Sequence, residues 1–121
     1  MSYALLIVED PRQRATRSEA EGRALYAAMQ HFGESLAAEG RLLHVESLAG
    51  AEGAVRVQRR AGATRLLDGP YAEAKEMIGG FFLLRNVSLD EAIAIAGRCP
   101  AAEWASVEVR ALAPCYDGST G

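Results

Sequence analysis

Cysteine and histidine are scarce in this chain, and their positions exclude the usual structural metal sites. Cys99 and Cys115 have no CxxC spacing, and His31 and His44 lie far from both in the sequence. A structural zinc ion needs four ligands that cluster together. We therefore expect no metal site, no cofactor, and two reduced thiols in a cytoplasmic protein.

Long apolar runs and a basic surplus are also missing. No apolar stretch approaches transmembrane length, and no basic segment followed by a signal-length apolar run stands at the N-terminus. The formal net charge is −3, from 16 acidic and 13 basic side chains, whereas a nucleic-acid-binding domain normally carries a basic stripe. Arg56, Arg59 and Arg60 form the densest basic cluster, which we interpret as a solvated hairpin end. We expect neither a membrane nor a nucleic acid as a partner.

The length and composition indicate one domain. The chain has 121 residues, and 50% of them are hydrophobic, enough for a core without a metal or a disulfide. We assign residues 1–113 to this domain and residues 114–121 to a C-terminal tail with little order.

The first third of the chain predicts a strand and a long helix. Residues 3–8 form a short apolar run, typical of a buried strand. Ser18 followed by Glu21 is a capping box. The helix that it opens runs to about residue 39, because Gly40 is a natural stop.

A second capping box, Ser88 with Glu91, opens a helix over about 88–98 that Pro100 ends. The three- and four-residue spacing of its apolar residues predicts which of them face inward. These are Leu89, Ala92, Ile93 and Ala96.

The remaining apolar segments predict strands, at 41–48, 54–58, 64–67, 79–87 and 105–112. Ala61-Gly62 is the turn of an inserted hairpin. The resulting order, β-α-β-(β-hairpin)-β-α-β, is the split βαβ plan, so we expect an α+β, ferredoxin-like antiparallel sheet. Phe81 to Leu84 offer bulky apolar groups to both sheet faces. Because the helices cover only one face, we expect a homodimer packed sheet to sheet.

Residues 68–82 combine a turn, a charge cluster and a glycine pair directly before an apolar strand. Such a segment predicts a functional loop on a rigid sheet. Asp68, in the turn with Gly69 and Pro70, either caps the turn through backbone N–H groups or points into a cleft. Lys75 binds an anionic group or joins Glu73 and Glu76 in a solvated ion pair. Gly79-Gly80 indicates close backbone approach.

A second candidate pair lies on the strand 41–48. His44 and Glu46 are two residues apart, so they point to the same sheet face, together with Leu42 and Leu48. They form either an acid–base pair or a hydrogen-bonded pair at an edge or interface. Cys99 is interpreted as a small buried thiol.

These motifs carry a resemblance to a known family. The run Asp68-Gly69-Pro70-Tyr71, the charge cluster after it and Gly79-Gly80-Phe81-Phe82 resemble the DGPF-domain branch of the YCII-related superfamily. Tyr71 stands where phenylalanine is usual. Further similar segments are 3–7, Glu46, 89–92 and 107–110, so that the resemblance covers nearly the whole chain.

The resemblance implies a dimeric α/β-barrel-like assembly with a pocket near the dimer interface. Some YCII-like relatives are enzymes with a His–Asp pair, one of them similar to a dehydrochlorinase. The histidine belongs near Met29 and the aspartate where Cys99 stands, and neither is present here. Other members lie beside genes for extracytoplasmic-function sigma factors.

Two functions follow as hypotheses. The first is a small-molecule-binding dimer whose pocket is lined by His44, Glu46, Asp68, Gly69, Pro70, Tyr71, Glu73 and Lys75. If it is an enzyme, we expect cofactor-free acid–base chemistry of the lyase or isomerase type. Glu46 or Asp68 would be the base, and Lys75 would stabilise negative charge. The second is a regulatory module that contacts a sigma factor.

Overall fold

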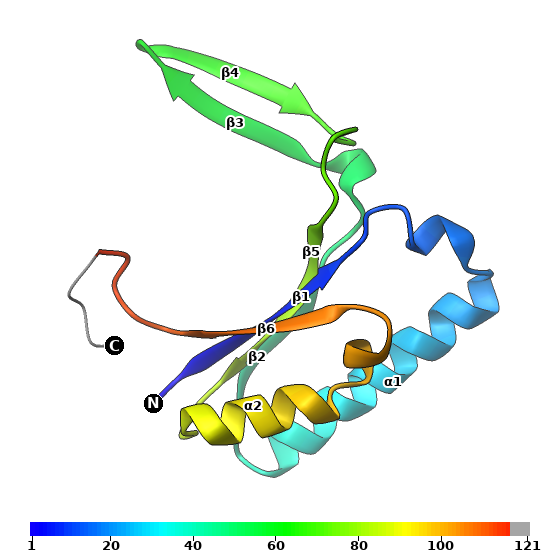
Figure 1. The fold of residues 1–121 in the computed structure, drawn as a ribbon, viewed down its shortest axis with the longest axis vertical. Helices are drawn as coiled ribbons and strands as arrows, with labels where there is room; N and C mark the ends of the chain where they lie inside the picture. Colours follow the sequence, from blue (N-terminus) through cyan, green and yellow to red (C-terminus); the bar gives the residue numbers. More distant parts are fainter. Residues whose placement is uncertain (117–121) are drawn as a thin grey trace.

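A four-stranded antiparallel sheet carries two helices on one face, and a separate two-stranded hairpin projects from it (Figure 1). The computed structural model describes residues 1–116, so residues 117–121 of the predicted tail lie outside the described residues. The elements are β1 (Tyr3–Glu9), α1 (Glu19–Ala38), β2 (Leu42–Ser47), β3 (Val55–Arg60), β4 (Ala63–Asp68), β5 (Met77–Leu84), α2 (Leu89–Arg98) and β6 (Ser106–Ala111). The predicted ferredoxin-like α+β fold is confirmed.

The sheet has the strand order β2-β5-β1-β6, which places β1 and β5 at its centre. The pairing of β1 with β5 shifts register after Ile7, which lies opposite Gly80, whereas Val8 lies opposite Ile78. Gly79 is thus the extra residue of a β-bulge. Bulges redirect side chains and are frequent next to functional sites.

Both helices begin where the sequence predicts. The hydroxyls of Ser18 and Ser88 accept hydrogen bonds of 3.1 Å from the backbone N–H groups of Glu21 and Glu91. Each glutamate in turn accepts from the backbone N–H of its serine, which completes a capping box. Gly40 has φ +74°, a value that favours glycine, at the end of α1.

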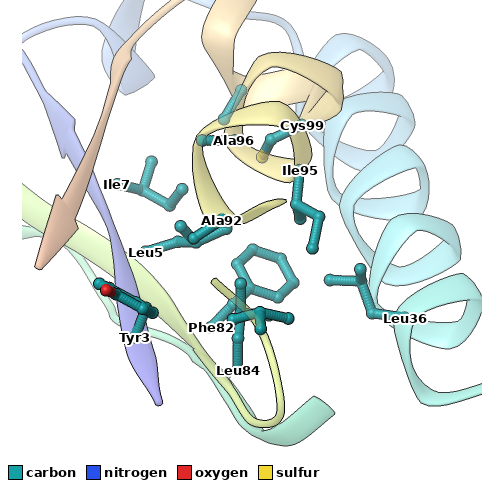
Figure 2. Packing of buried hydrophobic residues seen from close by; sticks show 12 residues of the cluster. Tyr3, Leu5, Ile7, Leu36, Phe82, Leu84, Ala92, Ile95, Ala96 and Cys99 are labelled. Carbon is teal, nitrogen blue, oxygen red and sulfur yellow. The ribbon is translucent and has the colours of Figure 1, made fainter. Parts of the chain in front are cut away.

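The hydrophobic core lies between the sheet and the two helices (Figure 2). Leu5 and Phe82 point from the two central strands toward Leu36 of α1 and Ile95 of α2. Phe82 also meets Phe32 edge to face, with ring centroids 5.3 Å apart. Side chains from four elements therefore hold the helices on this face.

The inward face of α2 differs from the prediction. Ala92 and Ala96 are buried as expected, but Leu89 and Ile93 are 50% and 52% exposed, and Ile95 is buried instead. A helix turns about 100° per residue, so Ile93 points away from the stripe that Ala92 and Ile95 share. The prediction selected residues because they are apolar, whereas the packing against the sheet buries a different side of the helix.

Strand β2 also corrects a prediction. His44 and Glu46 share a face, but Leu42 does not lie on it, because the pairing with β5 shifts register between Leu42 and His44. Leu42 instead packs against the core on the helical side. An irregularity of one residue inverts the alternation on which the prediction rested.

The hairpin of β3 and β4 extends from the end of the sheet, away from both helices (Figure 1). Ala61 and Gly62 form its turn with φ values of 51° and 78°, as a tight hairpin turn requires. Val57 and Leu66 pair across the hairpin and are 65% and 68% exposed. The hairpin therefore contributes surface rather than core.

Candidate functional site

A cleft of about 1070 Å³ lies between α1 and the β2–β5 side of the sheet. Only Gly33 and Leu36 of the 20 residues of α1 are buried, so part of the helix remains accessible beside the cleft. Apolar side chains from α1, β2, β5 and the segment after β2 line its walls. They are Leu25, Met29, Leu42, Val45, Leu48 and Phe82.

An ion pair between a buried glutamate and a partly exposed arginine borders the polar part of this cleft. Arg14 donates two hydrogen bonds to Oε1 of Glu9, from Nε at 2.9 Å and from Nη2 at 2.6 Å. It also donates from Nη1 to the carbonyl of Leu48 at 2.8 Å and from Nη2 to that of Gly79 at 3.3 Å. Glu9 is only 6% exposed, which is rare for a charged residue. Arg14 thus joins β1, β5 and the end of β2.

Gly79 makes room for this pair. A Cβ atom at position 79 would overlap Glu9 Oε1 and stand 2.8 Å from Arg14 Nη2. At Gly80 a Cβ would lie 2.9 Å from the carbonyl oxygen of Glu46 in β2. The predicted close approach at Gly79-Gly80 is confirmed, and one of the two neighbours is a charged side chain rather than backbone.

The turn after β1 brings Arg14 back to Glu9. Asp10 accepts from the backbone N–H of Arg12 at 2.9 Å, and from its Nε and Nη2 at 3.0 and 2.9 Å. These hydrogen bonds from Arg12 lower the pKa of Asp10 from 3.8 to about 2. Gln13 then donates from its backbone N–H to the carbonyl of Asp10 and from Nε2 to that of Trp104, both at 3.0 Å. The turn is therefore tied to both β1 and the segment before β6.

The rim of the cleft carries solvated charges. Arg23 and Glu19 form an i,i+4 ion pair of 2.7 Å, with both side chains about four-fifths exposed. The guanidinium of Arg17 lies 5.9 Å from the ring centroid of Trp104. Exposed pairs of this kind contribute little to stability, so their significance is the polarity of the entrance.

His44 and Glu46 form a hydrogen-bonded pair of 2.7 Å on β2, with both side chains 56% exposed. Their cross-strand partners are Leu83 and Phe81, and the His44 ring lies 6.2 Å from that of Phe81. The predicted shared face of His44 and Glu46 is confirmed. It is the sheet face that the helices leave open, although Glu46 also borders the cleft.

The Asp68-Gly69-Pro70 turn lies at the base of the hairpin. The N–H of Gly69 donates to the carbonyl of Ala54 at 2.7 Å, and a Cβ there would overlap the carbonyl oxygen of Ala51. The carboxylate of Asp68 accepts no hydrogen bond from residues 1–116, so the predicted turn cap is not formed. Gly69 rather than Asp68 holds this turn together.

Tyr71 contacts both strands of the hairpin. Its hydroxyl donates to the carbonyl of Leu67 at 3.1 Å, and the guanidinium of Arg56 stands 3.8 Å from the ring centroid. The ring of Tyr71 therefore makes a cation–π contact with Arg56 of the arginine cluster.

Glu73, Lys75 and Glu76 form no ion pair with one another, so the predicted local pair is absent from this part of the described chain. Lys75 and Glu76 line a shallow hollow of about 570 Å³, together with Glu103 of the turn before β6. The hollow adjoins the cleft, since Glu9 and Trp104 line both, but Lys75 and Glu76 line only the hollow and Glu46 lines only the cleft. Asp68, Tyr71 and Glu73 line neither of them.

The chain alone therefore does not assemble the predicted pocket from all its residues, and their roles in binding or catalysis stay predictions. The sequence prediction does not include Glu9 and Arg14 among the site residues. Glu9 looked like the polar end of a strand, and nothing local indicates that it turns inward. The available signal was a glycine pair at a strand entry, which implies that some neighbour comes close.

Cys99 is a buried thiol, as expected. It is 2% exposed, and its Sγ lies 3.9 Å from Met29 Sδ. Burial raises the pKa of this thiol. Among residues 1–116, no three His, Cys, Asp or Glu side chains gather as metal ligands, and no helix has the length and apolarity needed to cross a membrane.

The fold and the cleft define an α+β protein with a split βαβ sheet and an amphipathic cleft beside its long helix. The chain belongs to the YCII-related domain family, whose model matches residues 1–115. It is similar to "Uncharacterized protein R00369" of Rhizobium meliloti (strain 1021), with 33% identity over 115 residues that cover 93% of each chain. The DGPF branch within this family stays a prediction.

Proposed function

We propose that the protein binds a small molecule in the cleft between α1 and β2, and that it works as a homodimer. The cleft is the observation that supports small-molecule binding. A volume of about 1070 Å³, apolar walls and a few fixed polar groups are typical of small-molecule sites. The ion pair of Glu9 and Arg14 provides the polar groups, and the bulge at Gly79 holds them in place.

The binding site can be tested by filling the cleft. A Cβ at Gly22 of α1, which lines the cleft, would meet nothing within 4 Å, so Gly22→Leu should fold and occupy that space. Gly97→Leu is the matched control, because position 97 has the same freedom in α2 and does not line the cleft.

Hexanol titrated into isotope-labelled protein serves as the probe. Amide resonances of residues around Met29 and Leu48 should shift in the wild type and in Gly97→Leu, and they should not shift in Gly22→Leu. Equal shifts in all three proteins, or shifts scattered over the molecule, would show that the cleft is not the binding site.

The open face of the sheet supports the dimer. Leu6, Val8, Phe81 and Leu83 alternate with the core-facing residues, and all four are only half-buried in the single chain. Leu6 lies opposite Phe81, so the apolar groups of the two central strands are contiguous. A contiguous apolar patch of this kind usually marks an interface. A second copy of the same sheet face would cover it.

Light scattering at micromolar concentration tests the dimer. The wild type should have the mass of two chains, and Leu83→Glu should have the mass of one, because it places a charge within the interface. Ile93→Glu is the control, since Ile93 is 52% exposed on α2 and should leave the dimer intact. A monomeric wild type would refute this part of the proposal.

Acid–base catalysis is a narrower form of the same function. The His44–Glu46 pair has suitable chemistry and would be enclosed in a sheet-to-sheet dimer. Lys75 lines the hollow and not the cleft, so within one chain it is not positioned to stabilise charge formed beside Glu46. The positions of Glu46 and Lys75 therefore favour ligand binding by a single chain, and catalysis would require the assembled dimer.

A regulatory module that binds a sigma factor is the alternative. The exposed hairpin supports it, since β3 and β4 carry Arg56, Arg59, Arg60 and Arg65 on a chain that is acidic overall. A pull-down from source-cell lysate with wild type and with a variant in which these arginines are replaced by glutamine tests it. Recovery of a sigma factor by the wild type alone would favour this function.

A further inference from the structure

One oxygen of the buried Glu9 carboxylate has no partner. Both hydrogen bonds from Arg14 go to Oε1, at 2.9 and 2.6 Å, and no residue among 1–116 donates to Oε2. The Glu9 side chain is 5% exposed, and the residue lines the cleft. This oxygen keeps some contact with solvent although the side chain is almost wholly buried, so it defines a place for an incoming N–H or O–H group.

The charges around Glu9 limit which hydrogen-bond donor of a ligand can bind to Oε2. The guanidinium of Arg14 balances the carboxylate, so the two groups together have no net charge. A charged ligand head placed beside them would lose water and would meet no net opposite charge at this pair. Other charged groups of the lining lie elsewhere: Arg23 pairs with Glu19 at the solvated rim, Glu46 pairs with His44, and Arg17 lies 5.9 Å from the ring centroid of Trp104. An uncharged donor satisfies Oε2 without this penalty.

We infer that the ligand is an amphipathic molecule with an apolar body and an uncharged hydrogen-bond-donating head, such as a hydroxyl or an amide N–H, and that Glu9 Oε2 accepts from that head. The apolar body lies against Met29, Val45 and Phe82. This inference rests on the proposed binding function and adds the chemical class of the ligand.

Three probes with similar six-carbon composition test the head group. Hexanol has a hydroxyl donor, methyl pentyl ether is its isomer without a donor, and hexanoate has a charged acceptor. Their dissociation constants are measured by the amide shifts of cleft residues in isotope-labelled protein. Hexanol should bind about tenfold tighter than either of the others, because a hydrogen bond to a charged group changes affinity by about that factor or more.

Glu9→Gln assigns the effect to the carboxylate. Its side-chain carbonyl can accept from Arg14 while its NH₂ group replaces Oε2, so the cleft then presents a donor. The ratio between hexanol and methyl pentyl ether should fall to about one. Glu39→Gln is the matched control and should keep the wild-type ratio, since Glu39 is 44% exposed and does not line the cleft. If Glu9→Gln fails to fold, the three-probe comparison on the wild type still decides.

Each outcome has a distinct meaning. Equal affinity of hexanol and the ether in the wild type would overturn the role of Glu9 while leaving the binding function of the cleft intact. Tightest binding of hexanoate would also overturn it and would assign the head group to Arg14. If no probe shifts the cleft residues, both this inference and the proposed function fail.

Discussion

The carboxylate of Glu9 occupies the space that a side chain at position 79 would need. A Cβ at Gly79 would overlap Glu9 Oε1, and it would stand 2.8 Å from the Arg14 Nη2 atom that donates to the same oxygen. A charged pair is thereby placed at the bulge between the two central strands, next to the cleft. The glycine is required by a tertiary contact rather than by its own backbone angles.

Gly79→Ala should therefore destabilise the fold. The added methyl group forces the ion pair to move, and overpacking of this kind costs about 1–3 kcal/mol. The free energy of unfolding, measured by urea denaturation, checks this. Gly97→Ala is the control, because a Cβ there meets nothing within 4 Å and the change should stabilise α2 by up to about 1 kcal/mol. Equal effects of the two substitutions would show that Gly79 has no special environment.

The capping boxes predict an acid-dependent loss of stability. Hydrogen bonds with the backbone and side chain of Ser18 lower the pKa of Glu21 below its usual 4.5, and Ser88 does the same for Glu91. Because the folded pKa is depressed, this contribution is present above pH 4.5 and is lost as the pH falls through the folded pKa.

Ser18→Ala removes the capping box of α1 and leaves that of α2 intact. Carboxyl titration by NMR should show the pKa of Glu21 returning toward its usual value, while that of Glu91 stays low as an internal control. The stability difference between wild type and Ser18→Ala should shrink on acidification. A Glu21 pKa that does not respond would contradict the capping assignment.

Arg56 and Tyr71 should stabilise the hairpin as a coupled pair. Their cation–π contact has a guanidinium-to-centroid distance of 3.8 Å, and an exposed contact of this kind is worth about 0.5–1 kcal/mol. A double-mutant cycle with Arg56→Ala and Tyr71→Leu measures the coupling. Hydrogen exchange should accelerate at β3 and β4 and stay unchanged at β1. Additive effects would mean that the contact contributes nothing.

The two thiols should differ sharply in reactivity. Cys115 is exposed, whereas Cys99 is 2% exposed with a raised pKa. Since the thiolate is the reactive form, iodoacetamide at neutral pH should alkylate Cys115 quickly and Cys99 only on unfolding. Mass spectrometry of the native protein checks this. Rapid modification of Cys99 without denaturant would indicate frequent opening between α1 and α2.

Local features were predictable from the sequence. The capping boxes, the stop at Gly40 and the Ala61-Gly62 turn depend on residues within a few positions of each other, so their signals are contained in short segments. The apolar patterns also predict the elements and their order. The predictions that failed, such as the inward face of α2, depended on which stripe of a helix meets the sheet.

The candidate site was predictable only in part. His44 and Glu46 are neighbours on one strand, and strand periodicity places them together. Asp68, Tyr71 and Lys75 lie on a connection whose path no local rule specifies, and they do not line the cleft. Glu9 and Arg14 gained their significance from the bulge at Gly79: the glycine pair indicates a close neighbour there, but nothing local identifies that neighbour as Glu9.

By itself, then, the sequence determined the elements, their caps, the split βαβ order and the family, because these follow from short-range periodicity and from motifs along the chain. Only the tertiary structure decided that a cleft remains between α1 and the sheet, and that a bulge admits the nearly buried Glu9 with its partner Arg14. These features depend on contacts between residues far apart in the chain, where packing and register, rather than local preference, select the arrangement.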